Sequence, residues 1–291
     1  MKFWIPAKIF LLGEYIALRG LPSLVACTQP FFELEVEGHS EGLPQIFNIH
    51  LKSPAGRFIE AQGLDFESVR FHDPYHGQGG VGASTAQFLG CFYASKHTTC
   101  IDLNDLLATY RTYTFQNQGF PPSGVDLIAQ TAGGICYVDR IKNEQTVFAW
   151  PWPHLSLRFI RTRQKVLTHQ HLAELTSLPE GPFEELVLQA TQALLQKDPD
   201  PFIFAINEYG TQMALQHFVT AETQTLLAYV KQHPACLAAK GSGALGADIV
   251  MAVIVKEAED IFETWLSKHH VSTFATEDAL AFLPYNNDMN T

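Results

Sequence analysis

Two glycine-rich stretches are the segments of this sequence best suited to binding chemistry. The first, GQGGVGASTAQFLG at residues 77–90, places four glycines within six positions and continues as a run of good helix formers. The second, KGSGALGAD at residues 240–248, precedes an apolar run typical of a buried strand. A glycine loop that opens a helix presents unpaired backbone N–H groups and the positive end of the helix dipole. Both favour an anion, and phosphate is the usual one.

The residues of these loops leave two interpretations open. Neither loop has the GxxxxGK[ST] pattern of a P-loop. Residues 77–82 also lack the surrounding βα pattern and the suitable acid about 20 residues later that mark a dinucleotide-binding unit. The first loop is therefore either a phosphate-binding loop or a tight turn that allows a helix to pack closely.

The charge balance limits which partners we expect. The 291 residues carry a formal net charge of −11, with 30 Asp and Glu against 19 Lys and Arg, and 46% of them are hydrophobic. This composition is that of a globular protein with a sizeable core. Broad binding of nucleic acid or of an anionic membrane would need a basic surface, so we expect neither partner. An anionic small molecule would need a local cluster of cations.

Cysteine use and hydropathy indicate a cytoplasmic protein. The five cysteines are odd in number, widely spaced and without a CxxC pair, which favours free thiols in a reducing compartment over disulfides or a zinc site. No uninterrupted apolar run reaches the roughly 18–20 residues that a membrane-spanning helix needs.

The pattern of elements predicts an α+β fold. Alternating apolar and charged residues indicate strands in the first 40 residues, and residues 38–80 are interpreted as short strands and loops. Residues 102–117 predict a helix with Asp102 as its N-cap. The proline-rich WPWPH at residues 150–154 is the candidate domain boundary, which gives domains of residues 1–153 and 154–291. Strands and helices then mix without strict βα alternation.

Three stretches resemble, in order, the three signature motifs of the GHMP kinases, a family of small-molecule kinases. They are PAKIFLLGEYIALRGLPSLV, GGVGASTAQ and KGSGALGADIVMAV, and a fourth, PPSGVDLIAQTAGG, resembles the loop that carries the catalytic aspartate of mevalonate kinases. The resemblance extends over nearly the whole chain. It implies an N-terminal domain like ribosomal protein S5 domain 2, a ferredoxin-like C-terminal domain, and an active site in the cleft between them.

The resemblance implies that the chain binds ATP and Mg²⁺ at the first glycine loop. The residues that match the ATP-phosphate loop are Gly79, Gly80, Val81, Gly82, Ala83, Ser84 and Thr85. Ser84 stands where the family has a serine whose hydroxyl is a Mg²⁺ ligand, which suits a hard ion that prefers oxygen. The structural alternative for Ser84 is a helix N-cap. The family usually has two serines here, and Ala83 replaces the first.

The same resemblance assigns the catalytic pair. Asp126 matches the aspartate that accepts the proton of the attacking hydroxyl, and Lys8 matches a lysine that neutralises the transferred charge. The alternatives are an acid at a helix start for Asp126 and a solvated lysine for Lys8. For Glu14, within GEY, the sequence supports a structural role and a functional role equally.

Some residues depart from the family pattern. Mevalonate kinases carry a glutamate, a second Mg²⁺ ligand, where this chain has Phe115, and no carboxylate lies between Asp105 and Asp126. Leu245 and Ala247 replace glycines of the third motif. A non-catalytic nucleotide or metabolite sensor therefore stays as an alternative.

The motifs favour mevalonate as acceptor, with phosphomevalonate as the nearest alternative and sugars behind it. PSGVD and the short chain are similar to mevalonate kinase, whereas GEY and Asp248 are similar to phosphomevalonate kinase. Both acceptors are anionic, and LRFIRTRQK supplies cations close to the domain boundary. The structural alternative for these cations is a solvated strand edge, where charges discourage aggregation. The residues predicted to bind substrate are Glu14, Tyr15, Ser123, Arg161, Arg163, Gly243 and Ala244, with Arg111 as a further candidate. The sequence leaves the oligomeric state open, including a homodimer.

Overall fold

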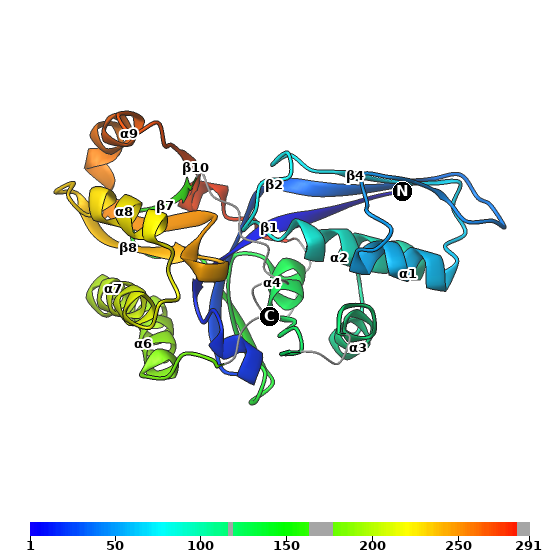
Figure 1. Ribbon diagram of the computed structural model, residues 1–291, viewed down its shortest axis with the longest axis horizontal. Coiled ribbons are helices and arrows are strands. Elements are labelled where there is room, and N and C mark those ends of the chain that lie inside the picture. Colours follow the sequence, from blue (N-terminus) through cyan, green and yellow to red (C-terminus); the bar gives the residue numbers. More distant parts are fainter. Residues whose placement is uncertain (116–118, 163–176, 284–291) are drawn as a thin grey trace.

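The structure is a computed structural model that describes residues 1–115, 119–162 and 177–283. Two sheets lie side by side along its long axis (Figure 1). The mixed content of helices and strands confirms the predicted α+β class. Every helix in the described ranges is too short or too polar to span a bilayer.

The first sheet has six strands in the order β3-β4-β2-β5-β6, with β1 paired to β2. Helices α1 to α4 lie together on one side of it (Figure 1). The long strand β2 pairs with β1 along most of its length, with β5 at its start and with β4 at its end. The elements are β1 (Lys2–Leu12), η1 (Ile16–Arg19), β2 (Ser23–Glu37), β3 (Gln45–Phe47), α1 (Pro54–Gln62), β4 (Ser68–His72), α2 (Ala83–Lys96), α3 (Leu103–Thr114), α4 (Val125–Ala132), β5 (Ile135–Asp139) and β6 (Glu144–Phe148).

The second sheet is antiparallel, with the order β10-β7-β9-β8. In chain order its strands are numbers 4-1-3-2, the arrangement of a ferredoxin-like sheet. The elements are β7 (Leu155–Arg161), α6 (Phe183–Gln196), α7 (Pro199–Leu215), α8 (Ala221–Val230), β8 (Cys236–Ser242), η2 (Ala244–Gly246), β9 (Ile249–Val255), η3 (Lys256–Ala258), α9 (Glu259–Ser267), β10 (Thr273–Thr276) and η4 (Glu277–Ala279).

Strand β9 is apolar without alternation because both of its faces are covered. Val250 and Ala252 pack in a cluster with Phe262 of α9, whereas Met251 and Val253 point into the main core. A strand covered on both faces has an unbroken hydrophobic sequence. The main core also contains residues of the first sheet, so both sheets share one continuous apolar interior.

The segment predicted as the domain boundary is packed rather than exposed. Trp152 is 1% exposed, and its ring lies 5.0 Å from that of Phe202 on α7. The proposed division after residue 153 falls between β6 and β7, and it stays a proposal. After β10 the chain returns to the first sheet, where the backbone N–H of Ala281 donates to the carbonyl of Cys27 at 2.8 Å.

Residues 38–80 contain a helix that the loop interpretation missed. Helix α1 begins after Ser53, whose side chain accepts a hydrogen bond from the backbone N–H of Gly56, and Pro54 fits its first turn. The buried Ala55, Phe58 and Ile59 follow helical spacing, a signal that the surrounding Gly, Pro and His residues obscured. The predicted N-cap Asp102 is confirmed, since its carboxylate accepts from the first N–H groups of α3.

Candidate active site

Helices α2 and α4 begin in the same way. Each follows a glycine with a left-handed backbone, Gly82 with φ 80° and Gly124 with φ 76°. Neither glycine can cap its helix with a side chain, so the first-turn N–H groups of α2 point out of the helix. Ser84 and Asp126 occupy the second position of their helices. The N-cap alternative for Ser84 is therefore wrong, because Gly82 is the N-cap.

Lys8 of β1 joins these two helix starts. Its backbone N–H donates to the carbonyl of Val81 at 3.0 Å, and its Nζ lies 3.0 Å from Oδ2 of Asp126. The Asp126 side chain is 27% exposed and that of Lys8 11%, so the pair borders solvent. A Cβ atom on Gly82 would lie 2.7 Å from Cγ of Lys8, which explains why this position needs glycine. The solvated-lysine alternative does not fit Lys8.

Gln130 supports this arrangement from the second turn of α4. Its Nε2 donates to the carbonyl of Pro6 at 2.8 Å and to that of Gly82 at 3.2 Å. One side chain thus connects β1, the glycine loop and α4. Sequence reasoning missed Gln130, although its position four residues after Asp126 puts both side chains on one helix face.

The third motif packs against the first glycine loop. A Cβ atom on Gly79 would lie 2.3 Å from Oδ1 of Asp248, and one on Gly80 would lie 2.7 Å from its Cβ. Close packing therefore explains both glycines without a ligand. The loop is still not covered, because Gly79 and Gly80 are half-buried and Ser84 is exposed.

Glu14 and Tyr15 hold the first and third motifs together. The carboxylate of Glu14 lies 2.5 Å from Nζ of Lys240, and both side chains are buried. The hydroxyl of Tyr15 accepts from the backbone N–H of Leu245 at 2.8 Å. Burial lowers the pKa of Lys240, and the charge of Glu14 opposes this shift. Lys240 is a second residue that sequence reasoning missed.

The residues predicted to bind substrate do not all meet. Ser123 lies directly before α4, and its hydroxyl accepts from the N–H of Val125 at 3.3 Å. Gly243 and Ala244 lie at the start of η2, where Ala244 is buried. The guanidinium of Arg161 lies over the rings of Tyr75 and Phe274, beside the segment that leads into the first glycine loop. Arg163 lies outside the described residues.

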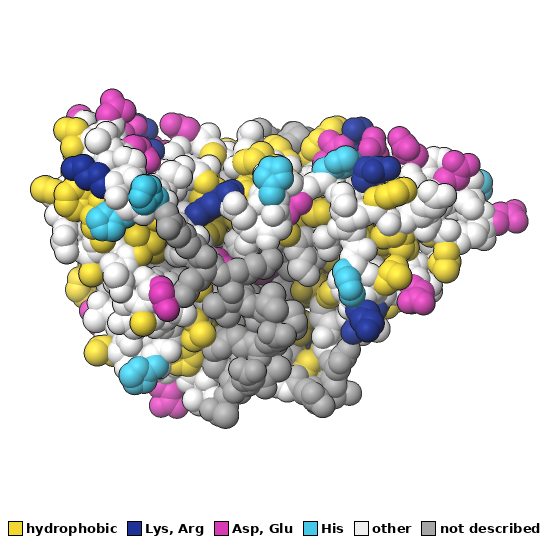
Figure 2. Space-filling model, turned by 45° about the horizontal axis from the view of Figure 1, so that its top comes forward, with side chains coloured by type: hydrophobic (Ala, Val, Ile, Leu, Met, Phe, Trp, Pro, Cys, Tyr) yellow, Lys and Arg dark blue, Asp and Glu magenta, His cyan; other side chains and the backbone are white. Residues whose placement is uncertain are grey.

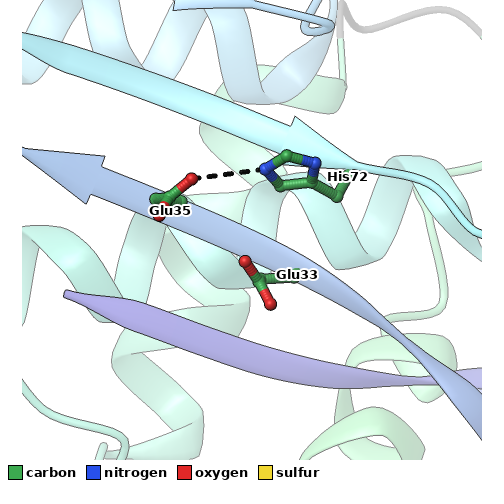
Figure 3. A group of neighbouring side chains, drawn as sticks. All are labelled: Glu33, Glu35 and His72. Atoms are coloured by element: carbon green, nitrogen blue, oxygen red, sulfur yellow. Dashed lines mark hydrogen bonds and ion pairs between the residues drawn. The ribbon is translucent and has the colours of Figure 1, made fainter.

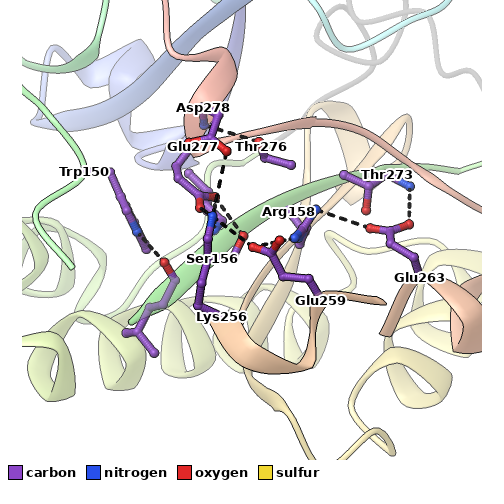
Figure 4. A network of polar contacts seen from close by, with 12 residues as sticks. Trp150, Ser156, Arg158, Lys256, Glu259, Glu263, Thr273, Thr276, Glu277 and Asp278 are labelled. Atoms are coloured by element: carbon purple, nitrogen blue, oxygen red, sulfur yellow. Dashed lines mark hydrogen bonds and ion pairs between the residues drawn. The ribbon is translucent and has the colours of Figure 1, made fainter. Parts of the chain in front are cut away.

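Arg158, a cation of the same strand, is committed to acidic partners. It is 6% exposed and lies 2.7 Å from Glu259 and 3.5 Å from Glu263 (Figure 4). Lys256 is paired in the same network with Glu277 at 2.5 Å. The charge of Arg158, which belongs to the predicted cation cluster, is therefore neutralised by acids of the protein itself.

The first loop has some, but not all, of the groups expected at a binding site for a nucleotide with Mg²⁺. Open N–H groups at the start of α2 suit phosphate oxygens. Ser84 is exposed in the first turn of α2, and its hydroxyl would be the protein ligand of the ion. Phe115 ends α3, and the first-turn acid of that helix, Asp105, is paired with Lys96 at 2.8 Å. The structure thus supplies no acid from α3 for the metal.

A separate acidic group lies far along the first sheet. Glu33, Glu35 and His72 face one another across β2 and β4 (Figure 3). Lys2 lies 2.8 Å from Glu33 and 3.1 Å from Glu35, so its ammonium already satisfies these carboxylates. On the face shown in Figure 2, Lys and Arg side chains are scattered among Asp and Glu.

Comparisons with known proteins define the fold. No family model matches the chain, and no curated protein is detectably similar to it in sequence. Solved structures match over almost the whole chain. The mevalonate kinase of Methanococcus jannaschii is 14% identical, with a TM-score of 0.69 over 95% of this chain and 97% of that one.

Two further structures agree with it. The phosphomevalonate kinase of Streptococcus pneumoniae is 15% identical, with a TM-score of 0.74 over 95% of this chain and 98% of that one. The galactokinase of Lactococcus lactis is 11% identical, with a TM-score of 0.76 over 97% of this chain and 93% of that one. The chain therefore has the GHMP kinase fold, and the fold implied by the motifs is confirmed.

Proposed function

We propose that this protein is a kinase that transfers the γ-phosphoryl group of ATP to a hydroxyl of a small anionic acceptor. Mevalonate is the first candidate acceptor, and phosphomevalonate is the alternative. The observation that carries the proposal is the ion pair between Lys8 and Asp126, which lies at the start of α4 and is joined through Lys8 to the glycine loop. Solved structures with the same fold, among them a phosphomevalonate kinase in complex with AMPPNP, support it.

Each residue has a defined task in this proposal. The N–H groups at the start of α2 bind the phosphates of ATP. Asp126 accepts the proton of the acceptor hydroxyl as its oxygen attacks phosphorus, and Lys8 orients the carboxylate and offsets the charge that moves. Mg²⁺, held by Ser84 and the nucleotide, would neutralise phosphate charge. Positioning and electrostatics are most of what phosphoryl transfer requires of a protein.

The test is ADP release with mevalonate, phosphomevalonate, galactose and homoserine, first with the unaltered chain and then with Asp126→Asn and Asp126→Ala. We expect both variants to lose roughly a hundredfold or more in kcat, since the proton acceptor is gone, while ATP affinity changes little. Asp105→Asn is the matched control, because Asp105 is also a first-turn helix acid. If Asp126 acts only on the helix dipole, the variants at both positions will be slightly less stable, and their turnover will be unchanged.

A non-catalytic sensor is the second candidate, favoured by the missing acid at Phe115. A sensor would release no ADP with any acceptor, yet ATP or an acceptor would raise its Tm. Turnover with any acceptor of the panel rules the sensor out.

A further inference from the structure

Two arginines, Arg111 on α3 and Arg140 directly after β5, flank the loop that leads to Asp126. Arg140 directly follows β5, and its Nη1 donates a hydrogen bond to the carbonyl of Ser123. A Cβ atom on Gly124 would lie 3.8 Å from this Nη1 and 2.4 Å from Cδ2 of Leu107 on α3. Arg111 is one helical turn after Leu107, on the same side of α3. The loop before α4 is thus flanked by both arginines.

Neither arginine is paired with a carboxylate among the described residues, although the chain is acidic overall. Asp139, the neighbour of Arg140 in sequence, is already occupied. It accepts from the N–H groups of Ile141 and Lys142, both at 3.0 Å, and its carboxylate lies 3.3 Å from Nζ of Lys142. The carboxylate closest to Arg140 in sequence is therefore already engaged by other donors.

The two positive charges flank the same loop, and no carboxylate of the described residues offsets either of them. Partial burial and the charge of Arg111 lower the pKa of Arg140. An oxyanion between the two groups would remove the repulsion, and guanidinium groups bind carboxylate and phosphate well because they can donate two parallel hydrogen bonds.

The position of the pair connects it to Asp126. Leu107 of α3 packs against Gly124, since a Cβ atom there would lie 2.4 Å from its Cδ2, so α3 lies beside the start of the helix that presents Asp126. Ser123 and Gly124, which contact Arg140, directly precede the helix that presents Asp126. Arg161, by contrast, lies over Tyr75 and Phe274, at the segment before the nucleotide loop.

We infer that Arg111 and Arg140 bind a carboxylate or phosphate group of the acceptor whose hydroxyl meets Asp126. This inference rests on the proposed kinase function and narrows it, because neutral acceptors such as sugars would leave the two charges unpaired. Among acceptors of kinases with this fold, it selects mevalonate and phosphomevalonate over galactose.

The test replaces each arginine by glutamine, singly and together, and measures KM for mevalonate, phosphomevalonate and ATP. We expect Arg111→Gln and Arg140→Gln each to raise KM for the anionic acceptor roughly tenfold or more, with KM for ATP changed less than about twofold. Arg70→Gln is the matched control, since it removes the same charge from β4, where Arg70 lies 4.1 Å from the ring of Phe47. Equal losses for both acceptors identify the carboxylate as the bound group, and a loss for phosphomevalonate alone identifies its phosphate.

Two results would overturn the inference. One is a KM for the acceptor that changes no more in the arginine variants than in Arg70→Gln. The other is a neutral sugar that is phosphorylated as efficiently as the anionic acceptors. Arg111→Gln keeps the test decisive if Arg140→Gln disturbs the loop through its bond to Ser123, because Arg111 is exposed on its helix. Arg140→Lys should restore part of the acceptor affinity.

Failure of the proposed kinase function can be distinguished from failure of the anion site. If the chain releases no ADP with any acceptor, the kinase proposal fails, and titration of mevalonate and of inorganic phosphate by calorimetry still tests the pair. Binding that is lost in the double variant and kept in Arg70→Gln supports the anion site. Equal binding by the unaltered chain, the double variant and Arg70→Gln would exclude the anion site.

Discussion

Two acids of the predicted site differ in exposure, and this difference separates their roles. Asp126 pairs with Lys8 at the edge of solvent, where a ligand can reach the carboxylate. Glu14 pairs with Lys240 in the interior, where both side chains are nearly inaccessible. At the level of single residues, the structure therefore favours a chemical role for Asp126 and a structural one for Glu14. A direct contact between Glu14 and a substrate stays a prediction.

Tyr75, next to the first glycine loop, supports a prediction about alkaline pH. Its hydroxyl donates to the carbonyl of Pro30 at 2.9 Å, and burial raises its pKa to about 12. A group whose pKa is raised on folding stabilises the fold below its unfolded pKa of about 10, and this contribution is lost as pH rises through the folded value.

From about pH 9 to about pH 11, the free energy of unfolding of the unaltered chain should therefore fall by about 1.4 kcal/mol more than that of Tyr75→Phe. Urea denaturation at both pH values measures the difference. The lost hydrogen bond to Pro30 lowers the free energy of unfolding equally at both, so it does not affect the comparison. Identical pH slopes for the two proteins would show that Tyr75 titrates as in the unfolded chain.

At the level of elements, the site is made of helix starts rather than of a pocket within one sheet. Helices α2 and α4 both begin at glycines with positive φ, and Lys8 of β1 lies between their first turns. A residue with a side chain at Gly82 would meet Lys8, and one at Gly79 would meet Asp248. The glycines thus allow three segments to approach one another at the end of a helix dipole.

Gly82→Ala tests this arrangement against Gly77→Ala. Both glycines have similar φ values, 80° and 77°, but a Cβ on Gly77 meets nothing within 4 Å. Both variants should lose about 1 kcal/mol from backbone strain. Only Gly82→Ala should also displace Lys8 and lower kcat, by roughly tenfold or more. Equal activity in the two variants would mean that the position of Lys8 does not matter for turnover.

At the level of the whole molecule, a small set of buried polar contacts joins the two sheets. Lys240 of β8 reaches Glu14, the hydroxyl of Tyr209 on α7 donates to the carbonyl of Glu14 at 2.8 Å, and Ser242 donates to the carbonyl of Phe10 at 2.8 Å. Together with the shared apolar core, these contacts hold the first and third motifs in one position. We therefore expect both halves to unfold in a single transition.

Lys240→Met should destabilise the chain by about 3–5 kcal/mol, because it leaves the carboxylate of Glu14 buried without a counter-charge. The double variant Glu14→Gln with Lys240→Met should lose less, since no isolated charge remains. Lys256→Met is the control, because Lys256 is 33% exposed and partly exposed pairs contribute about 0–1 kcal/mol. Urea denaturation measures all three, and a loss for Lys240→Met no larger than for Lys256→Met would contradict the argument.

Local signals in the sequence determined much of this protein. Hydrophobic periodicity predicted the strands of the first 40 residues and the helix after Asp102, Asp102 was identified as an N-cap, and the resemblance of the motifs to a known family implied the fold. The periodicity and the N-cap depend on neighbours within a few residues, through the period of a helix or strand and the capping of its first N–H groups. Helix α1 was missed although Ser53 and Pro54 carry such a signal.

Only the tertiary structure decided which charges meet. Lys240 and Glu14 are 226 residues apart, and Arg140, directly after β5, donates to the carbonyl of Ser123 before α4. It also showed that Trp152 is buried in a segment with the composition of a linker. The physical reason is that an ion pair or a buried ring depends on which elements become neighbours, which the pairing of β1 with β2 and the packing of α3 and α7 establish over long distances in the chain.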